Sequence, residues 1–330
     1  MNQLKSYTNK MVKKLITIIA PMYNEELVVE KYTKVTIEAL QLLDSNKYCY
    51  EILFINDGSQ DNTLREMLKM QEMYPLNCGI VNLSRNFGLE GAVHAGLQKA
   101  NGNAVIVMDA DLQDPPELII EMVRKWENGS DIVIASRESR SKDSFFKRFY
   151  AGIYYFILDW LSGKLKLEKD AANFRLLSRK AVDQLLALPE VNTYFRVNVP
   201  FIGMKTDIVK YDRKERVAGK TKYNFVSLIR CALDGLSSIS IEPLRKILIF
   251  IPFMFVLSLI GIIIGIFTDN MMQLFSFIFA SMGFFFMLVF ICLFVIGEYI
   301  GQIMVETRHR PTSIIYEYLP SKNSEKYELF

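Results

Sequence analysis

Short apolar runs alternate with stretches of helical periodicity through the first part of the chain. The apolar runs at residues 15–20, 51–55, 79–83, 104–108 and 131–135 predict buried strands. The intervening segments predict four helices: one that ends at about residue 43, one that begins near residue 61, and two that cover about 89–99 and 115–127. This alternation predicts an α/β fold with a mostly parallel sheet and helices on both faces.

The pattern is less regular after Arg137. Residues 145–161 are rich in aromatic side chains and predict a helix, and a short helix is expected from Arg179. Residues 213–223 are rich in basic side chains and are expected to form a loop. Residues 225–239 have an amphipathic pattern, which ends before the most apolar part of the chain.

Two long runs without charged residues follow, at 247–267 and 271–297. A helix of about 20 residues crosses a hydrocarbon core of about 30 Å. Because only residues 268–270 separate the runs, they predict a two-helix transmembrane hairpin. Two buried core helices are the alternative, but the runs are too long and too apolar for amphipathic core helices.

Basic residues flank this predicted hairpin. Arg245 and Lys246 precede it and Arg308 and Arg310 follow it, whereas the connecting loop carries only Asp269. Because positive flanks stay on the cytoplasmic side, we expect a multi-pass protein of the cytoplasmic (inner) membrane. No signal peptide is expected, since residues 1–14 lack an apolar region.

These patterns divide the chain into four expected parts. They are an α/β domain at 1–224 on the cytoplasmic side, an amphipathic interfacial region at 225–245, the hairpin at 246–297, and a cytoplasmic tail at 298–330. The overall composition, 51% hydrophobic, averages over these unlike parts.

Charge and residue content argue against several classes of function. A net charge of +3 gives no support for nucleic-acid binding. The chain has two histidines, so neither a histidine metal site nor a Ser–His–Asp triad is expected. Gly219-Lys220-Thr221 is not a P-loop, because position 214 is lysine rather than glycine. The four cysteines show no paired spacing and are expected to be reduced.

Two aspartates, Asp109 and Asp111, directly follow the predicted strand at 104–108. Such a strand would deliver both carboxylates to the carboxyl edge of the sheet, where open α/β folds bind ligands. Paired oxygen ligands suit Mg²⁺ or Mn²⁺ bridging a diphosphate. A solvated turn is the alternative interpretation of an isolated Asp-x-Asp.

Three further polar segments, at 20–25, 56–61 and 213–223, are expected at the same edge. The first two would clasp a nucleoside: Asp57 can accept a hydrogen bond from a base, and Gly58 allows close approach of the backbone. The basic segment would close over the diphosphate. Each segment alone could be a solvated turn, whereas four at one edge favour a ligand site.

Seven short motifs carry a resemblance to a known family. They are Pro-Met-Tyr-Asn-Glu-Glu at 21–26, Asn-Asp-Gly-Ser-Gln-Asp at 56–61, Leu-Ser-Arg-Asn-Phe-Gly at 83–88, Asp-Ala-Asp-Leu-Gln-Asp-Pro-Pro-Glu at 109–117, Asn-Phe-Arg-Leu at 173–176, Gly-Glu-Tyr-Ile-Gly at 297–301 and Arg-His-Arg-Pro at 308–311. Together they resemble glycosyltransferase family 2, and within it the polyprenyl-phosphate glycosyltransferases. Those include dolichyl-phosphate mannose synthase and the bacterial undecaprenyl-phosphate (bactoprenol) glucosyl- and N-acetylglucosaminyltransferases. The resemblance implies a Rossmann-like GT-A catalytic domain.

The resemblance also implies roles for individual residues. Asp109, Asp111 and Gln113 would hold the metal, and Asp111 would thereby take part in catalysis. Arg137 and Arg148 would face the acceptor phosphate, and Asp170 would be a base or a positioning carboxylate. The nucleotide and its phosphates would be bound by Pro21, Tyr23, Glu25, Asp57, Arg213, Arg216 and Lys222.

The implied reaction is inverting transfer of a sugar from a nucleotide-sugar, UDP-glucose or UDP-N-acetylglucosamine, to undecaprenyl phosphate. It would take place at the cytoplasmic membrane face, with Mg²⁺ or Mn²⁺, and yield a lipid-linked sugar for cell-envelope glycan modification. Contact with membrane lipid, a homo-oligomer and a flippase partner are implied as well. The alternatives are a membrane-anchored family 2 transferase with a non-lipid acceptor and a non-catalytic membrane scaffold.

The chain departs from the family pattern at two positions. Asn56 and Asn173 stand where the family often has aspartate, so the resemblance assigns no role to Asn173. The Gln-x-x-Arg-Trp motif of processive synthases is not found around Trp126 or Trp160, which disfavours a polymerising enzyme.

Overall fold

The computed structural model describes residues 13–137, 171–190, 194–212, 250–267 and 271–327. The chain divides into two compact units. An α/β unit comprises Met1–Arg148, Leu167–Lys222 and Pro311–Phe330, and a second unit comprises Phe149–Lys166 and Tyr223–Arg310. The helix expected at 145–161, the basic loop at 213–223 and the amphipathic segment at 225–239 lie outside the described residues.

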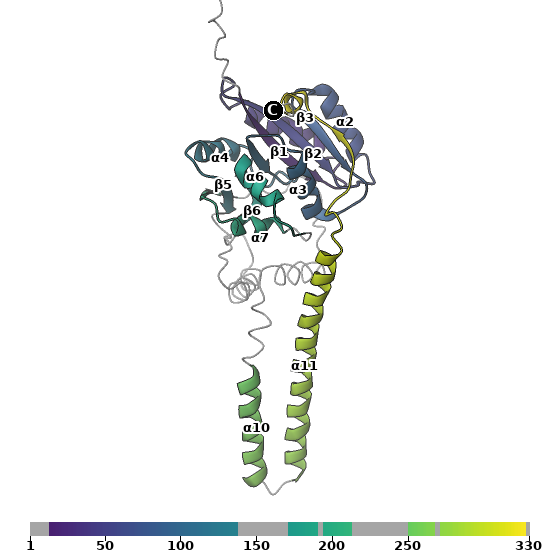
Figure 1. The fold of residues 1–330 in the computed structure, drawn as a ribbon, viewed down its shortest axis with the longest axis vertical. Helices are drawn as coiled ribbons and strands as arrows, with labels where there is room; N and C mark the ends of the chain where they lie inside the picture. Colours follow the sequence, from purple (N-terminus) through teal and green to yellow (C-terminus); the bar gives the residue numbers. More distant parts are fainter. Residues whose placement is uncertain (1–12, 138–170, 191–193, 213–249, 268–270, 328–330) are drawn as a thin grey trace, which may run out of the picture. The chain divides into compact units, whose positions relative to one another are not determined.

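A single mixed sheet forms the centre of the α/β unit (Figure 1). Its strand order is β7-β5-β6-β4-β1-β2-β3-β8. The strands are β1 (Lys14–Met22), β2 (Tyr48–Asn56), β3 (Cys78–Leu83), β4 (Ala104–Val107), β5 (Ile132–Arg137), β6 (Ala171–Ser178), β7 (Thr206–Tyr211) and β8 (Ile315–Leu319). Pairing is parallel except that β6 is antiparallel to β4 and β5, and β8 is antiparallel to β3. The predicted α/β class with a mostly parallel sheet is confirmed.

Helices pack on both faces of the sheet. One face is covered by α1 (Val29–Leu40), α2 (Thr63–Met73) and α4 (Leu118–Glu127), and the other by α3 (Gly88–Lys99), α6 (Arg179–Leu186) and α7 (Phe195–Phe201). Successive side chains of a strand point to opposite faces, so Ile18 and Ile19 of β1 join different clusters. Because both faces are covered, the central strands are continuous apolar runs, which is why they were predictable.

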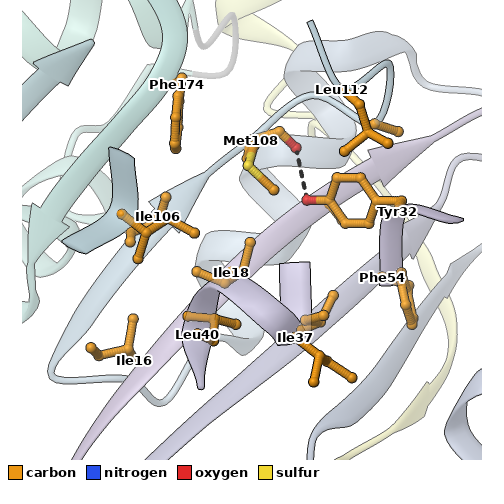
Figure 2. Close-up of a cluster of buried hydrophobic side chains, with 14 of the residues drawn as sticks. Ile16, Ile18, Tyr32, Ile37, Leu40, Phe54, Ile106, Met108, Leu112 and Phe174 are labelled. Atoms are coloured by element: carbon orange, nitrogen blue, oxygen red, sulfur yellow. Dashed lines mark hydrogen bonds between the residues drawn. The ribbon is translucent and has the colours of Figure 1, made fainter. Parts of the chain in front are cut away.

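The core beneath α1 supports the end of β4 (Figure 2). Tyr32 of α1 is fully buried, and its hydroxyl donates a hydrogen bond to the carbonyl oxygen of Met108 over 3.4 Å. Met108 directly precedes Asp109. The buried helix therefore holds the backbone from which the two aspartates project.

The strand pattern did not predict β6, β7 or β8. Strand β6 carries the buried polar residues Asn173 and Arg175, which interrupt its apolar sequence. Strands β7 and β8 form the two edges of the sheet and are only partly buried. Edge strands need less apolar surface than central ones, so their sequence signal is weak.

The C-terminal segment, expected as a tail, returns to the sheet. After β8, the short helix α12 (Lys322–Glu325) begins beside the buried carboxylate of Glu51. Glu51 accepts hydrogen bonds from the hydroxyls of Thr17 and Ser321, each over 2.6 Å. These bonds join the C-terminus of the chain to β1 and β2.

The second unit contains two apolar helices, α10 (Phe250–Phe267) and α11 (Met271–Thr307). Phe253 packs edge-on against Phe284 with ring centroids 5.9 Å apart, and Gly261 lies against the ring of Phe277. These contacts show that the helices run antiparallel. Among the described residues, α11 is long and apolar enough to cross a membrane, and it extends ten residues past the predicted end at residue 297. A hairpin of two membrane spans stays a prediction.

Candidate active site

The strand directions gather many polar segments at one edge of the sheet. The registers place Met22 beside Asn56, Asn56 beside Asn82, and Val107 beside Arg175. The carboxyl ends of β1 to β5 and β7 therefore share this edge with the amino ends of β6 and β8. The segments after β1, β2 and β4 meet there, as the sequence pattern indicated.

The loops after β1 and β2 are bonded to each other. The backbone N–H of Asn24 donates to Ser59 Oγ over 3.0 Å, and Asn24 Oδ1 accepts from the N–H of Gln60 over 2.8 Å. The N–H of Glu25 donates to Thr63 Oγ1 over 2.8 Å. Of the expected nucleotide residues, Pro21 is buried in β1, while Tyr23 and Glu25 are half-buried at the edge. Their contacts with a nucleotide stay predictions.

Asp57 joins the loop after β2 to the loop after β3. Its side chain is 4% exposed, and its two oxygens accept hydrogen bonds from the N–H groups of Phe87, over 2.7 Å, and Gly88, over 3.0 Å. Burial raises the pKa of Asp57 to about 6, although both backbone bonds act in the opposite direction. Each carboxylate oxygen can accept a further hydrogen bond, so the expected contact with a base stays a prediction.

Gly58 also packs the loop after β2 closely against the loop after β3. Its φ of +64° lies in the left-handed region, and a Cβ atom there would lie 2.3 Å from the carbonyl carbon of Arg85. The close approach expected for Gly58 is thus to the backbone of Arg85 and Asn86. The guanidinium of Arg85 stacks on the ring of Phe87, with 4.0 Å between guanidinium carbon and ring centroid.

Asp109 and Asp111 lie together directly after β4. Asp109 and Asp111 are partly exposed, and Asp111 Oδ1 accepts from the N–H of Gln113 over 3.1 Å, closing the turn. Leu112, between Asp111 and Gln113, has a φ of +53° and a buried side chain. Burial raises the pKa of Asp109 to about 6, and the nearby carboxylates of Asp114 and Asp111 act in the same direction.

This cluster of negative charge fits a divalent cation. Asp109 and Asp111 present hard oxygen ligands at the edge, and their mutual repulsion is what a bound cation would relieve. Within the described part of the chain, no three His, Cys, Asp or Glu side chains converge as a complete metal site. Mg²⁺ is commonly held by one or two carboxylates together with water and substrate phosphates, so two aspartates are a sufficient protein contribution.

Asp114 connects this loop to the end of β7. Its buried carboxylate accepts a hydrogen bond from the hydroxyl of Tyr211, at the end of β7. Arg137 ends β5 and pairs in register with Tyr211, so the structure brings its backbone to the same edge. The other expected catalytic and phosphate-binding residues lie outside the described residues, and their roles stay predictions: Arg148, Asp170, Arg213, Arg216 and Lys222.

Two residues at this edge were missed by sequence reasoning. Asn173 of β6 is buried, and its side chain hydrogen-bonds Asp109. Its Oδ1 atom also accepts from Nε of Arg196 over 2.7 Å. Arg196 is on α7, with no feature of the surrounding sequence to mark it.

A half-buried glutamate, Glu90, holds the start of α7. Glu90 of α3 accepts a hydrogen bond from the N–H of Phe195 over 2.8 Å, and burial raises the pKa of Glu90. Arg175 is buried, and burial lowers its pKa to about 10. Both groups face the segment that carries Arg196.

Comparison with known proteins identifies the family of the chain. Residues 17–186 match the Glycosyl transferase family 2 pattern. The chain is 36% identical over 316 residues to the uncharacterized glycosyltransferase YkcC of Bacillus subtilis (strain 168), covering 94% of this chain and 96% of that protein. It is 38% identical over 306 residues to the bactoprenol glucosyl transferase of Shigella phage SfV, covering 91% and 97%.

A solved structure gives a more distant match. Glucosyl-3-phosphoglycerate synthase from Mycobacterium tuberculosis aligns with a TM-score of 0.47 and 16% identity, covering 68% of this chain and 80% of that one. The family match covers strands β1 to β6 and the residues Asp57, Asp109 and Asp111, and the two relatives match more than nine tenths of the chain. The chain belongs to glycosyltransferase family 2.

Proposed function

We propose that the chain transfers a sugar from a nucleotide-sugar to undecaprenyl phosphate at the cytoplasmic face of the membrane. The observation that carries this proposal is the similarity to a bactoprenol glucosyl transferase at 38% identity, which spans nearly the whole of both chains. A transferase of soluble acceptors would need the two apolar helices only as an anchor. The donor is a UDP-linked glucose or N-acetylglucosamine.

The apolar helices support a lipid acceptor. Large apolar side chains of α11, such as Phe279 and Phe290, are each 67% exposed. Exposed apolar surface of this extent is typical of a membrane-contacting segment. An acceptor with a polyprenyl tail stays in the bilayer, so the enzyme has to reach the plane of the headgroups. A homo-oligomer and a flippase partner are further expectations from the family resemblance.

The edge of the sheet supplies the donor site. The nucleoside would lie over the joined loops after β1, β2 and β3, with Pro21, Tyr23, Glu25 and Asp57 around it. The diphosphate would extend toward Asp109 and Asp111. Those two aspartates, with Gln113, would hold Mg²⁺ or Mn²⁺, and the ion would neutralise negative charge on the departing diphosphate. The basic residues Arg213, Arg216 and Lys222 would bind the same phosphates.

The proposed reaction is one direct displacement. An oxygen of the lipid phosphate forms a bond to the anomeric carbon while the bond from that carbon to the donor phosphate oxygen breaks. The nucleoside diphosphate leaves with the electron pair, so an α-linked donor gives a β-linked product. A phosphomonoester is largely ionised near pH 7, so no strong base is required. Arg137 and Arg148 would hold the acceptor in line, and Asp170 would act as a base or orient these arginines.

A donor screen tests the proposal. The full-length protein in detergent would be incubated with undecaprenyl phosphate, Mg²⁺ and single nucleotide-sugars, and the lipid fraction analysed by mass spectrometry. We expect one donor to add the mass of one sugar to the lipid phosphate. Hydrolysis or transfer to a soluble acceptor, with the lipid unchanged for every donor, would instead support a membrane-anchored transferase with a non-lipid acceptor.

A further inference from the structure

The guanidinium of Arg196 lies at the edge that holds the two aspartates. Its Nε donates to Asn173 Oδ1 over 2.7 Å, and the Asn173 side chain also hydrogen-bonds Asp109. One buried amide therefore fixes the positions of a cation and a carboxylate at the same time. An asparagine can do this because its oxygen accepts and its nitrogen donates.

The backbone before Arg196 is held independently of that bond. Glu90, on α3, accepts from the N–H of Phe195 over 2.8 Å. The ring of Phe195 is buried, with the guanidinium carbon of Arg175 lying 5.5 Å from its centroid. Helix α7 therefore starts at a position set by α3 and β6, and the direction of Arg196 is set before any ligand binds.

The guanidinium of Arg196 hydrogen-bonds a neutral side chain, while the carboxyl groups of Asp109 and Glu90 feel its charge from nearby and have their pKa values lowered by it. Among the described residues, the bond to the neutral side chain of Asn173 is the hydrogen bond that its guanidinium makes. Arg196 is an exposed residue, so solvent and ligands can reach it. An aspartate at position 173 would form an ion pair with the guanidinium, whereas the neutral asparagine leaves the Arg196 donors that Asn173 does not use open to an anion.

The strand order decides which part of the reactants Arg196 would meet. Asp57 follows β2, whereas Asn173 belongs to β6, and β4 with its aspartates comes between them in the sheet. Arg196 is thus on the side of the aspartates away from the nucleoside loops. In the proposed donor site, the groups on that side would be the outer phosphate of the donor and the phosphate of the acceptor.

We propose that Arg196 binds a phosphate oxygen of the reactants, with Asn173 and Glu90 as its positioning residues. This inference rests on the proposed function. Two sources share this chemistry, the donor diphosphate and the lipid phosphate, and they predict different kinetics. Arg196 on the donor would alter the KM for the nucleotide-sugar, and Arg196 on the acceptor would alter the KM for the lipid.

The test compares R196Q and R196K with wild type, with both KM values measured separately on the full-length protein. The control is R124Q, which removes an exposed arginine from α4, on the opposite face of the sheet. Loss of a charge-assisted hydrogen bond to phosphate should raise one KM by about ten-fold or more in R196Q. R196K should recover part of that loss, because lysine keeps the charge without the forked geometry. R124Q should behave as wild type.

Unchanged KM values in R196Q, within two-fold for both substrates, would overturn the inference if wild type is active. A lower turnover together with a lower thermal unfolding midpoint, with both KM values unchanged, would also overturn it, since that result indicates a structural role. A wild type that makes no lipid product would instead contradict the proposed function. In that case, calorimetric binding of UDP and of undecaprenyl phosphate decides the point: weaker binding of either by R196Q than by R124Q supports Arg196, and equal binding of both rejects it.

Discussion

Gly58 lies against the backbone of Arg85 so closely that a Cβ atom would be 2.3 Å from the Arg85 carbonyl carbon. This contact joins the loop after β2 to the loop after β3, and Asp57 reinforces it through the N–H groups of Phe87 and Gly88. The proposed nucleoside pocket is therefore built from loops that hold each other in place without a ligand.

Substituting Gly58 by alanine should destabilise the protein strongly. The new methyl group would clash with backbone, and the left-handed φ would add strain, for a total of about 3 kcal/mol or more. G88A is the matched control, because Gly88 has a φ of +81° but nothing within 4 Å of a Cβ atom. That variant should lose only about 1–2 kcal/mol. The thermal unfolding midpoints of both variants measure this, and equal losses would show that the contact with Arg85 is unimportant.

Asp57 should make stability depend on pH. Its pKa is raised by burial to about 6, above the ordinary value of an aspartate. A carboxyl group with a raised pKa in the folded state contributes stability that is fully present below its unfolded pKa and is lost as the pH rises through the folded pKa. The stability of wild type relative to D57N should therefore fall between about pH 4 and pH 6 and level off above pH 7.

Thermal unfolding of wild type and D57N across this pH range checks the sign. A difference that increases with pH would mean that the two backbone hydrogen bonds outweigh burial, and that the pKa of Asp57 is lowered. Measuring the difference between the two proteins removes the contribution of the other carboxyl groups, provided that they titrate alike in both.

The C-terminal segment should depend on the bond between Ser321 and Glu51. S321A removes a hydroxyl that donates to a buried carboxylate, which should cost about 1–3 kcal/mol. The control T206A removes an exposed hydroxyl that bonds a nearby carbonyl, and should cost less than about 0.5 kcal/mol. Hydrogen exchange of the β8 and α12 amides should accelerate in S321A alone. Unchanged protection there would mean that strand pairing is sufficient to hold the segment.

The position of the aspartate pair was predictable because its cause is local. A buried apolar strand followed at once by Asp109 and Asp111 leaves little choice about where the carboxylates emerge, and neighbouring parallel strands end at the same edge. The same reasoning placed Asp57 there. What it did not provide was the partners of Asp57, which belong to the loop after β3, some 30 residues further along the chain.

The remainder depends on contacts between distant parts of the chain. Glu90 and Phe195 are 105 positions apart, and Ser321 and Glu51 are 270 apart. Asn173 drew attention as a departure from the family pattern, but its role between Asp109 and Arg196 follows only from the antiparallel placement of β6 beside β4. The edge strands β7 and β8 were missed because partial burial leaves a weak apolar signal.

The most direct test of the account is the rate of lipid-linked sugar formation by wild type and D111N. The full-length protein would be stripped of metal with a chelator and then assayed with undecaprenyl phosphate, the donor found in the screen, and increasing Mg²⁺. D183N, which alters an exposed aspartate in an ion pair with Arg179, is the control. We predict that wild type and D183N regain activity with Mg²⁺ while D111N stays folded and inactive at every concentration. Equal turnover by D111N, or a wild-type rate that is unaffected by the chelator, would contradict the central claim that the aspartates hold a cation on the donor.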